Sequence, residues 1–435
     1  MIALQDNPQI KSMEKKKARP SPIKRFFSFL GPGLITGASD DDPSGIATYS
    51  QAGAQFGTST LWTALITFPL MAAMQEMCAR IGIVTSKGLT STIRNHYPRP
   101  VLYIMILFTF PAIILNIGAD IAGMGAVANL MVPSIPSIVF TFAFTIVLIL
   151  LIIYLPYQKM ASFLKYLCII LLCYLVVPFL SKQNWGSIAR QTFIPTIHFN
   201  KPFISILVGI LGTTISPYLF FWQATMESED IQHQQQKLVV DKKIIQKMGW
   251  DVDAGMLFSC LVMFFITLTA GTVLFEGGIH QIDTVEQAAK ALEPIAGKLS
   301  YVLFAIGIIG TGFLAIPVLS GSLSYILSDS FDWDSGLDKK YYEAKPFYSV
   351  IIFSLLIGLG INYLGISPVQ ALIYTAILYG VTSPVMIAII LHISNNKKIM
   401  GEFTNGRLSN ILGIITLVIM TAAASALLYF EFAGK

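Results

Sequence analysis

Residues 31–45 read GPGLITGASDDDPSG and place three consecutive carboxylates, Asp40, Asp41 and Asp42, inside an apolar segment that extends to residue 55. Each charge would cost about 2.5–3.5 kcal/mol at the centre of a lipid bilayer, so the three cannot face lipid. Pro43 removes a backbone donor, and Gly45 tolerates dihedral angles that other residues avoid. Irregular backbone at membrane depth survives only where it is buried in protein or lines a cavity. The stretch therefore predicts a membrane helix that unwinds beside a functional site.

The composition of the whole chain indicates a multi-pass membrane protein. Its 435 residues are 54% hydrophobic and 12% charged, whereas soluble domains carry about 25% charged residues. This difference excludes a soluble enzyme, a nucleic-acid-binding protein and a disordered chain. Windows of about 19 residues predict eleven spans, near residues 29–55, 59–84, 101–131, 135–155, 161–181, 203–226, 251–276, 300–327, 346–364, 368–393 and 409–431.

The basic residues predict the orientation of these spans. With a cytoplasmic N-terminus, 23 of the 29 Lys and Arg residues fall on the inner side and 6 on the outer side, as the positive-inside rule requires. We expect residues 1–28 to form a basic cytoplasmic tail that meets anionic lipid. Residues 29–435 should form a single transmembrane domain, in a bacterial inner membrane. The polar stretch 230–250 is expected to be an amphipathic cytoplasmic connector.

The sixth span carries a second interruption, where residues 209–218 read GILGTTISPY. Pro217 could simply kink the helix, with Thr213 and Ser216 satisfying the freed carbonyls. Interrupted helices at corresponding positions of two halves, however, point to a secondary transporter with its site at the midplane. The two halves would span residues 29–182 and 203–393, and an extra helix would span residues 409–431.

Together the two breaks offer carboxylate, hydroxyl and carbonyl oxygens, which are hard ligands for a hard cation. The predicted metal ligands are Asp41, Asp42, Gly45, Thr213 and Ser216. The predicted lining of the substrate pathway is Asp40, Pro43, Ser44, Pro217, Tyr218 and Gln223. Asp120 and Glu76 are candidates for a proton relay, or for a salt-bridge network with Arg80. An alternative for Asp40 or Asp41 is to cap the resumed helix or to pair with Arg80.

The residues around the first break resemble the first transmembrane segment of the NRAMP family of divalent metal transporters. The matching stretch extends from Gly31 through Asp42-Pro43 to Gly57, and further matches lie in residues 74–85, 120–122, 303–307 and 396–401. The resemblance implies an all-α LeuT-type fold of two inverted five-helix repeats plus an eleventh helix, with helices 1 and 6 unwound. It also implies divalent metal transport by alternating access.

The site positions depart from the family pattern, which takes an Asp and an Asn from Asp-Pro-Gly-Asn and a Met from Ala-Thr-Val-Met-Pro-His. Asp42, Pro43 and Pro217 match that pattern, as does Asp120, at a carboxylate that the family associates with proton movement. The replacements are Ser44 for Gly, Gly45 for Asn, Thr213 for Ala, Ser216 for Met, and Tyr218 and Gln223 for two histidines. The chain thus resembles the NRAMP-related branch that carries Mg²⁺.

Loss of the soft thioether leaves oxygen donors and weakens discrimination for transition metals. The expected cargo is a hard, partly hydrated ion, Mg²⁺ with Mn²⁺ as a second candidate, and loss of the histidines weakens proton coupling. Two alternatives are a carrier of a small organic or amino-acid-like solute and a sensor or scaffold that no longer transports. No Gly-rich phosphate loop occurs, and the four cysteines have no metal-ligand spacing. We expect no enzyme activity, no ATP, no nucleic-acid partner and no cofactor besides the transported ion.

Overall fold

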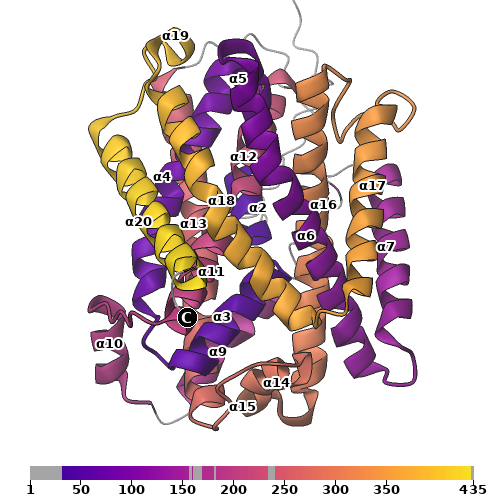
Figure 1. Cartoon of the computed structure of the whole chain (residues 1–435), viewed down its shortest axis with the longest axis vertical. Helices are drawn as coiled ribbons and strands as arrows, with labels where there is room; N and C mark the ends of the chain where they lie inside the picture. The colour runs from indigo at the N-terminus through magenta and orange to yellow at the C-terminus, as the bar shows by residue number, and fades with distance from the viewer. Residues whose placement is uncertain (1–31, 156–158, 160–168, 181–182, 234–240, 433–435) are drawn as a thin grey trace, which may run out of the picture.

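The computed structural model describes residues 32–155, 159, 169–180, 183–233 and 241–432, and within these residues every regular element is helical (Figure 1). The predicted basic tail, residue 31 and the first part of the predicted fifth span lie outside the described residues. The all-α prediction is confirmed for the part of the chain that is described.

The first half of the chain begins with a helix in two pieces. The two pieces are α2 (Pro32–Asp40) and α3 (Pro43–Phe56). The first half continues with α4 (Trp62–Thr85), the short α5 (Leu89–His96), α6 (Arg99–Met131) and α7 (Ser137–Tyr154). After a gap come η1 (Ile169–Leu172), α9 (Cys173–Leu180) and α10 (Trp185–Phe193).

The second half also begins with a helix in two pieces, α11 (Lys201–Thr214) and α12 (Pro217–His233). Next come α13 (Lys242–Ala270), which continues as the π-helical η2 (Gly271–Phe275), and the small elements α14 (Val285–Ala289), η3 (Lys290–Leu292), α15 (Glu293–Ala296) and η4 (Gly297–Leu299). The chain ends with α16 (Ser300–Phe331), α17 (Lys345–Ile361), η5 (Asn362–Leu364), α18 (Pro368–Asn395), α19 (Lys397–Met400) and α20 (Arg407–Phe432).

Seven helical segments in the described residues are long and apolar enough to cross a membrane, and α17 is a shorter apolar helix. The other predicted spans correspond to the pair α2 and α3, to α4, and to α9. The predicted connector at residues 230–250 is partly wrong: α12 continues to His233, and α13 begins at Lys242. Asp241 caps α13 by accepting a hydrogen bond of 2.9 Å from the Ile244 amide, which starts the helix well before the apolar segment.

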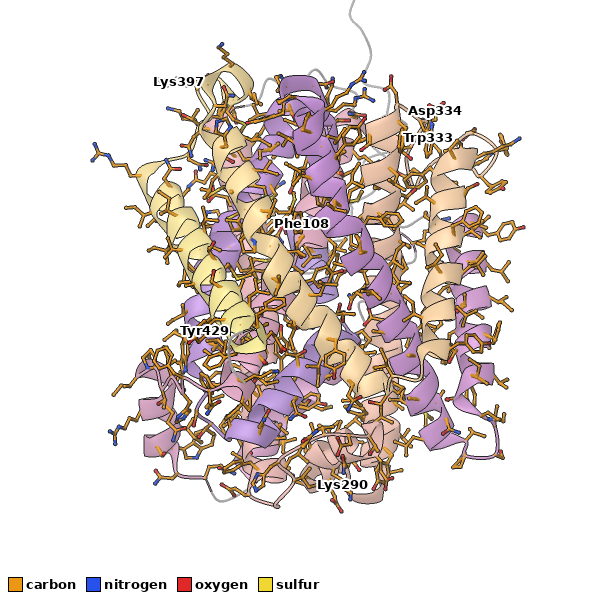
Figure 2. The ribbon with its side chains drawn as sticks, viewed as in Figure 1. Phe108, Lys290, Trp333, Asp334, Lys397 and Tyr429 are labelled. Atoms are coloured by element: carbon orange, nitrogen blue, oxygen red, sulfur yellow. The ribbon has the colours of Figure 1, made fainter. Side chains whose placement is uncertain are left out.

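The two ends of the bundle carry different connections. In Figure 1, α5 and α19 lie at one end, whereas α10, α14 and α15 lie at the other. Figure 2 shows Lys397 and Asp334 at the first end and Lys290 at the second, with mostly apolar side chains along the middle. Exposed apolar residues such as Leu107, Phe353 and Val418 form part of this middle band, as expected of a surface that faces lipid.

The second broken helix lies in the interior of the bundle. In the segment Lys201–Gln232, 89% of the most apolar window is buried, compared with 22% in α7 and 28% in α20. The irregular backbone between α11 and α12 is therefore shielded by protein. Non-helical backbone at membrane depth has to be buried in protein or line a cavity, and this segment is buried.

Glycines let the helices around the breaks approach backbone to backbone. A Cβ atom at Gly212 of α11 would lie 2.1 Å from the Ala376 carbonyl oxygen of α18, and one at Gly37 of α2 would lie 2.2 Å from the Gly255 carbonyl oxygen of α13. Small residues permit this close packing in membranes. These contacts fix the position of each broken helix against a continuous neighbour.

We expect Gly212→Ala to destabilise the chain, because the neighbouring atoms are backbone and cannot move aside independently. Overpacking of this kind costs about 1–3 kcal/mol or more. Thermal unfolding of the purified chain in detergent measures the effect. Gly249→Ala is the matched control, since no atom lies within 4 Å of a Cβ at that position. Equal unfolding temperatures for the two variants would contradict the packing argument.

Candidate functional site

Asp42 caps the helix that resumes after the first break. Its Oδ1 accepts hydrogen bonds from the Gly45 amide and the Ser44 hydroxyl, each 2.7 Å long. Pro43 follows as the first helical residue, a position where proline's missing N–H costs nothing. The cap of the resumed helix, offered above as an alternative role for Asp40 or Asp41, is therefore Asp42, which is 2% exposed.

The other oxygen of Asp42 is directed toward α6 and α18. Asp42 Oδ2 accepts a 2.9 Å hydrogen bond from Asn116 Nδ2, and Asn116 Oδ1 accepts one of 3.0 Å from the Thr375 hydroxyl. Asp120 lies one turn after Asn116 on α6, so both side chains share one helix face. Asp120 is fully buried, and neither carboxylate oxygen has a hydrogen-bond partner.

Asp40 and Asp41 instead meet α13. The Ser259 hydroxyl donates to Asp40 Oδ2 at 2.6 Å and lies 3.4 Å from Asp41 Oδ1. Both aspartates are fully buried, and Asp40 Oδ1 and Asp41 Oδ2 have no hydrogen-bond partner. The aspartate run thus divides between two sides of the break.

The second break faces the first. A Cβ at Gly45 would lie 3.3 Å from the Thr213 hydroxyl oxygen, and the Tyr218 hydroxyl donates to the Ser39 carbonyl at 3.1 Å. Ser216 lies close enough to Asp40 to interact with its carboxyl group, but its hydroxyl makes no hydrogen bond of acceptable geometry. The residues predicted at the two breaks are therefore brought together, and Pro217 begins α12 beside them.

Gln223 lies further along α12, in a network that joins three helices. Its Oε1 accepts from the Thr36 hydroxyl of α2 at 2.5 Å, and its Nε2 donates to Glu227 Oε1 at 2.9 Å. Nearby, the Gly33 amide of α2 donates to Asp251 Oδ2 of α13 at 2.7 Å. Gln223 is thus part of a contact between α2 and its neighbours. In the sequence, Glu227 lies with Glu229 and Asp230 in an acidic cluster at the inner end of the sixth span, which is typical of a solvated helix end. This interpretation is wrong for Glu227, which is only 6% exposed.

Glu76 forms an ion pair with Arg80 one turn later on α4, with 3.9 Å between Oε1 and Nη1. Arg80 also donates from Nη2 to Asn405 Oδ1 at 2.6 Å. This is the salt-bridge arrangement that the sequence offered as the alternative to a relay. Arg80 does not form an ion pair with the aspartates of the break in the described residues.

Four acidic side chains lie around the first break without a basic partner. Asp40, Asp41, Asp42 and Asp120 are all at most 2% exposed, and among the described residues no Lys, Arg or His lies within 4.0 Å of their carboxylates. A buried, unpaired charge is very costly. In this closed arrangement of the described chain, no three acidic, His or Cys side chains converge on one metal position, so hydroxyl and carbonyl oxygens or water must complete any coordination shell.

Sequence reasoning missed the residues that neighbouring helices contribute. Asn116 and Thr375 hold Asp42, Ser259 bridges Asp40 and Asp41, and the Ser383 hydroxyl donates to the Ile215 carbonyl in the second break at 3.0 Å. Only Asn116 carried a signal, because it lies four residues before the intramembrane Asp120. The others are single hydroxyls in long apolar helices, where such residues usually bond to their own helix.

Comparison with known proteins identifies relatives over nearly the full length. The divalent metal cation transporter MntH of Caldanaerobacter subterraneus is 25% identical over 419 residues, which cover 95% of both chains. MntH of Mesorhizobium japonicum is 24% identical and covers 98% of this chain and 93% of its own length.

Solved structures show the same fold at lower identity. A variant of the Eremococcus coleocola manganese transporter has a TM-score of 0.73 at 19% identity, covering 95% of this chain and 89% of that one. A nucleobase-cation-symport-1 family transporter has a TM-score of 0.55 at 12% identity, covering 92% of both chains. The predicted LeuT-type fold with interrupted helices 1 and 6 is confirmed.

The family model called Nramp, described as natural resistance-associated macrophage protein-like, matches residues 33–430. This range includes both helix breaks and all the described membrane helices that surround them. The chain is a multi-pass integral membrane protein, and it belongs to the Nramp family.

Proposed function

We propose that the protein is a secondary transporter, not an enzyme, that moves divalent metal cations across the membrane by alternating access. The observation that carries this proposal is the group of four buried carboxylates: Asp40, Asp41 and Asp42 lie at the first helix break, which the second break faces, and Asp120 lies on the neighbouring α6. Full-length relatives named as divalent metal cation transporters support it. The same carboxylates argue against an anionic or amino-acid-like solute, whose carboxylate they would repel.

The proposed cargo is a hard, partly hydrated divalent ion, with Mg²⁺ preferred and Mn²⁺ as a second cargo. Asp41, Asp42, Thr213, Ser216 and the backbone at Gly45 would supply oxygen ligands, a set that suits Mg²⁺. Thr213 supports this assignment because its hydroxyl occupies the space next to Gly45, where the family pattern has an asparagine.

Sulfur atoms also lie near the breaks, on α13. The Thr67 hydroxyl contacts both Cys260 Sγ and Met263 Sδ at 3.9 Å, and the Thr214 hydroxyl contacts Met263 Sδ at 3.7 Å. These sulfurs therefore already have polar neighbours from the protein. By contrast, oxygen atoms around the breaks lack a hydrogen-bond partner and could act as metal ligands; they belong to Asp40, Asp41, Asp120 and Ser216. Free oxygen ligands support a hard ion.

The structure is closed on both sides of the proposed site. Toward the α5 end, α2 is held by the Thr36–Gln223 hydrogen bond and the Gly33–Asp251 hydrogen bond. Toward the other end, the Gln51 side chain of α3 accepts a 2.8 Å hydrogen bond from the Ile282 amide. Alternating access requires each closure to open in turn. We propose that the α5 end is cytoplasmic, in a bacterial inner membrane, with lysines and arginines concentrated on that side.

Proton coupling is proposed to be weak. The two positions that hold histidine in the family pattern are occupied by Tyr218 and Gln223, and both side chains are engaged in hydrogen bonds within the protein. Neither group titrates near neutral pH. Asp120 remains the proposed candidate for carrying a proton in this part of the chain, and Glu76 is the weaker candidate because it pairs with Arg80.

Uptake into proteoliposomes tests the proposed cargo. We expect Mg²⁺ to enter liposomes that contain the protein, and excess Mg²⁺ to inhibit Mn²⁺ entry, because both ions would use the same oxygen donors. A pH-sensitive dye inside the liposomes should report little proton entry. Protein-free liposomes are the control. Mn²⁺ entry that a large excess of Mg²⁺ leaves unchanged would reject the hard-ion preference, and absence of any divalent uptake would reject the proposed function.

A further inference from the structure

The three adjacent aspartates are separated by the local backbone. Asp40 is the last residue of α2, Asp42 is the N-cap of α3, and Asp41 lies between the two helices. Because the chain changes direction here, Asp42 is held by Asn116 on one side, whereas Asp40 and Asp41 are bridged by Ser259 on the other. The carboxylates therefore belong to two groups with different neighbours.

The group on the α6 side contains Asp42 and Asp120. Three hydrogen bonds already use the Asp42 carboxylate, from Gly45, Ser44 and Asn116. The two oxygens of Asp120 have no hydrogen-bond partner. This group contains Asp42, one of the two aspartates that the proposed function uses as ligands.

The group on the α13 side contains Asp40, Asp41 and Ser259. One oxygen of each aspartate lacks a hydrogen-bond partner, although both side chains are fully buried. Ser216, from the second break, supplies an independent sign of a ligand: its hydroxyl is fully buried and lies beside Asp40 without making a hydrogen bond of acceptable geometry. Oxygen atoms from the two breaks and from α13 thus lie close together.

Charge balance favours a cation at each group. The four carboxylates carry a formal charge of −4 when ionised, and no basic side chain within 4.0 Å compensates them in the described residues. One divalent ion would balance only half of this charge. Two acidic groups, one of Asp42 and Asp120 and one of Asp40 and Asp41, would each match the charge of one divalent ion.

We infer that the protein holds a second divalent cation between α2, α12 and α13, bound by Asp40, Asp41 and Ser216 and positioned by Ser259. This inference rests on the proposed function and refines its ligand set: Asp41 and Ser216 bind the second ion, whereas Asp42, Thr213 and the backbone at Gly45 bind the first. Ser259 is a positioning residue, because its hydroxyl contacts both carboxylates, at 2.6 Å from Asp40 Oδ2 and 3.4 Å from Asp41 Oδ1.

The number of bound ions tests this inference directly. The full-length chain is equilibrated with Mg²⁺ by dialysis, and the Mg²⁺ bound per chain is measured by elemental analysis. We expect two ions in the unmodified protein, and one in the double variant Asp40→Asn, Asp41→Asn. Asp42→Asn should also bind one, because it leaves the α13 group intact. Ser394→Ala, which removes another buried serine hydroxyl without a hydrogen-bond partner, is the control and should bind two.

A milder variant covers the case in which the double variant does not fold. Ser259→Ala should weaken the binding of one of the two Mg²⁺ ions by about tenfold and leave the other unchanged. One ion per unmodified chain, or unchanged binding in Ser259→Ala, would overturn the inference. Occupation of the second position by Na⁺ but not by Mg²⁺ would also overturn it. If uptake of divalent ions persists while only one ion binds, the second position is rejected and the proposed function stands.

Discussion

Replacing Asp42 with asparagine should reduce divalent cation uptake to the level of protein-free liposomes while the chain still folds. Removing one charged partner from a buried ionic interaction costs about 3–5 kcal/mol, which corresponds to a loss of affinity of more than roughly 100-fold. The measurement is initial Mg²⁺ uptake into proteoliposomes, with protein incorporation determined for each variant. Uptake within about twofold of the unmodified protein would exclude the Asp42 carboxylate as a ligand, since twofold is well under 1 kcal/mol.

Asparagine is suitable because it retains the structural role of Asp42. Asn and Asp are about equally good N-caps, whereas alanine at an N-cap costs about 1 kcal/mol. The hydrogen bond to α6 can also be kept: if the Asn116 amide turns over, its oxygen can accept from the new asparagine and its NH₂ can donate to the Thr375 hydroxyl.

Asp42→Ala provides the matched comparison. It removes both the cap and the charge, so it should lose uptake like Asp42→Asn and also unfold at a lower temperature. If only Asp42→Ala loses uptake, the contribution of Asp42 is structural and the cation is bound elsewhere. Thermal unfolding in detergent, measured for both variants, separates these outcomes.

The positions of both breaks could be predicted from the sequence because proline has a fixed place in a helix. Pro43 and Pro217 are each the first residue of a resumed helix, as expected of a residue that lacks an N–H donor. The same rule also predicts the cap of the first resumed helix. An aspartate directly before a proline at the first helical position is the expected N-cap, which identifies Asp42 rather than Asp40 or Asp41 as the cap.

The partners of the aspartates could not be predicted, because they come from distant parts of the chain. Asn116, Ser259 and Thr375 lie on three different helices, and their alignment depends on how those helices pack. Backbone contacts at glycines set that packing, and a glycine in an apolar helix does not indicate which helix it meets. The number of carboxylates at the break was therefore predictable, but their division between α6 and α13 was not.

Burial of Glu227 could not be predicted from the sequence either. Its sequence neighbours Glu229 and Asp230 suggest a solvated helix end, yet Gln223 contacts it and α2 covers this part of α12. Gln223 therefore links Glu227 to α2. The contact between α2 and α13 is the second position where one substitution should have a large effect.

Gly37→Leu should open the end of the bundle that carries α5 and α19, the end proposed to be cytoplasmic. A Cβ at Gly37 would lie only 2.2 Å from the Gly255 carbonyl oxygen, and one at Gly33 would lie 2.7 Å from the Val252 amide nitrogen. A leucine side chain therefore cannot fit unless α2 moves away from α13. That movement would break the Gly33–Asp251 and Thr36–Gln223 hydrogen bonds.

Cys260 on α13 reports this opening, because it is 4% exposed and lies near Asp40 and Asp41. In a chain whose other three cysteines are replaced by alanine, a membrane-impermeant thiol reagent applied from the proposed cytoplasmic side should label Cys260 at least about fivefold faster in Gly37→Leu. A shift of about 1–3 kcal/mol from overpacking corresponds to roughly 5- to 150-fold in the population of the open state. Reagent applied from the opposite side should label both chains equally slowly, because α3 keeps its contacts.

The matched control is Gly249→Leu, which places the same side chain on α13 at a position with no atom within 4 Å of the new Cβ. It should leave both Cys260 labelling and uptake unchanged. Gly37→Leu should in contrast lose most uptake, since a transporter that stays open to one side cannot complete the alternating cycle. Slow labelling in Gly37→Leu together with normal uptake would show that α2 tolerates the leucine without moving. The closure at the α5 end would then have to depend on other contacts.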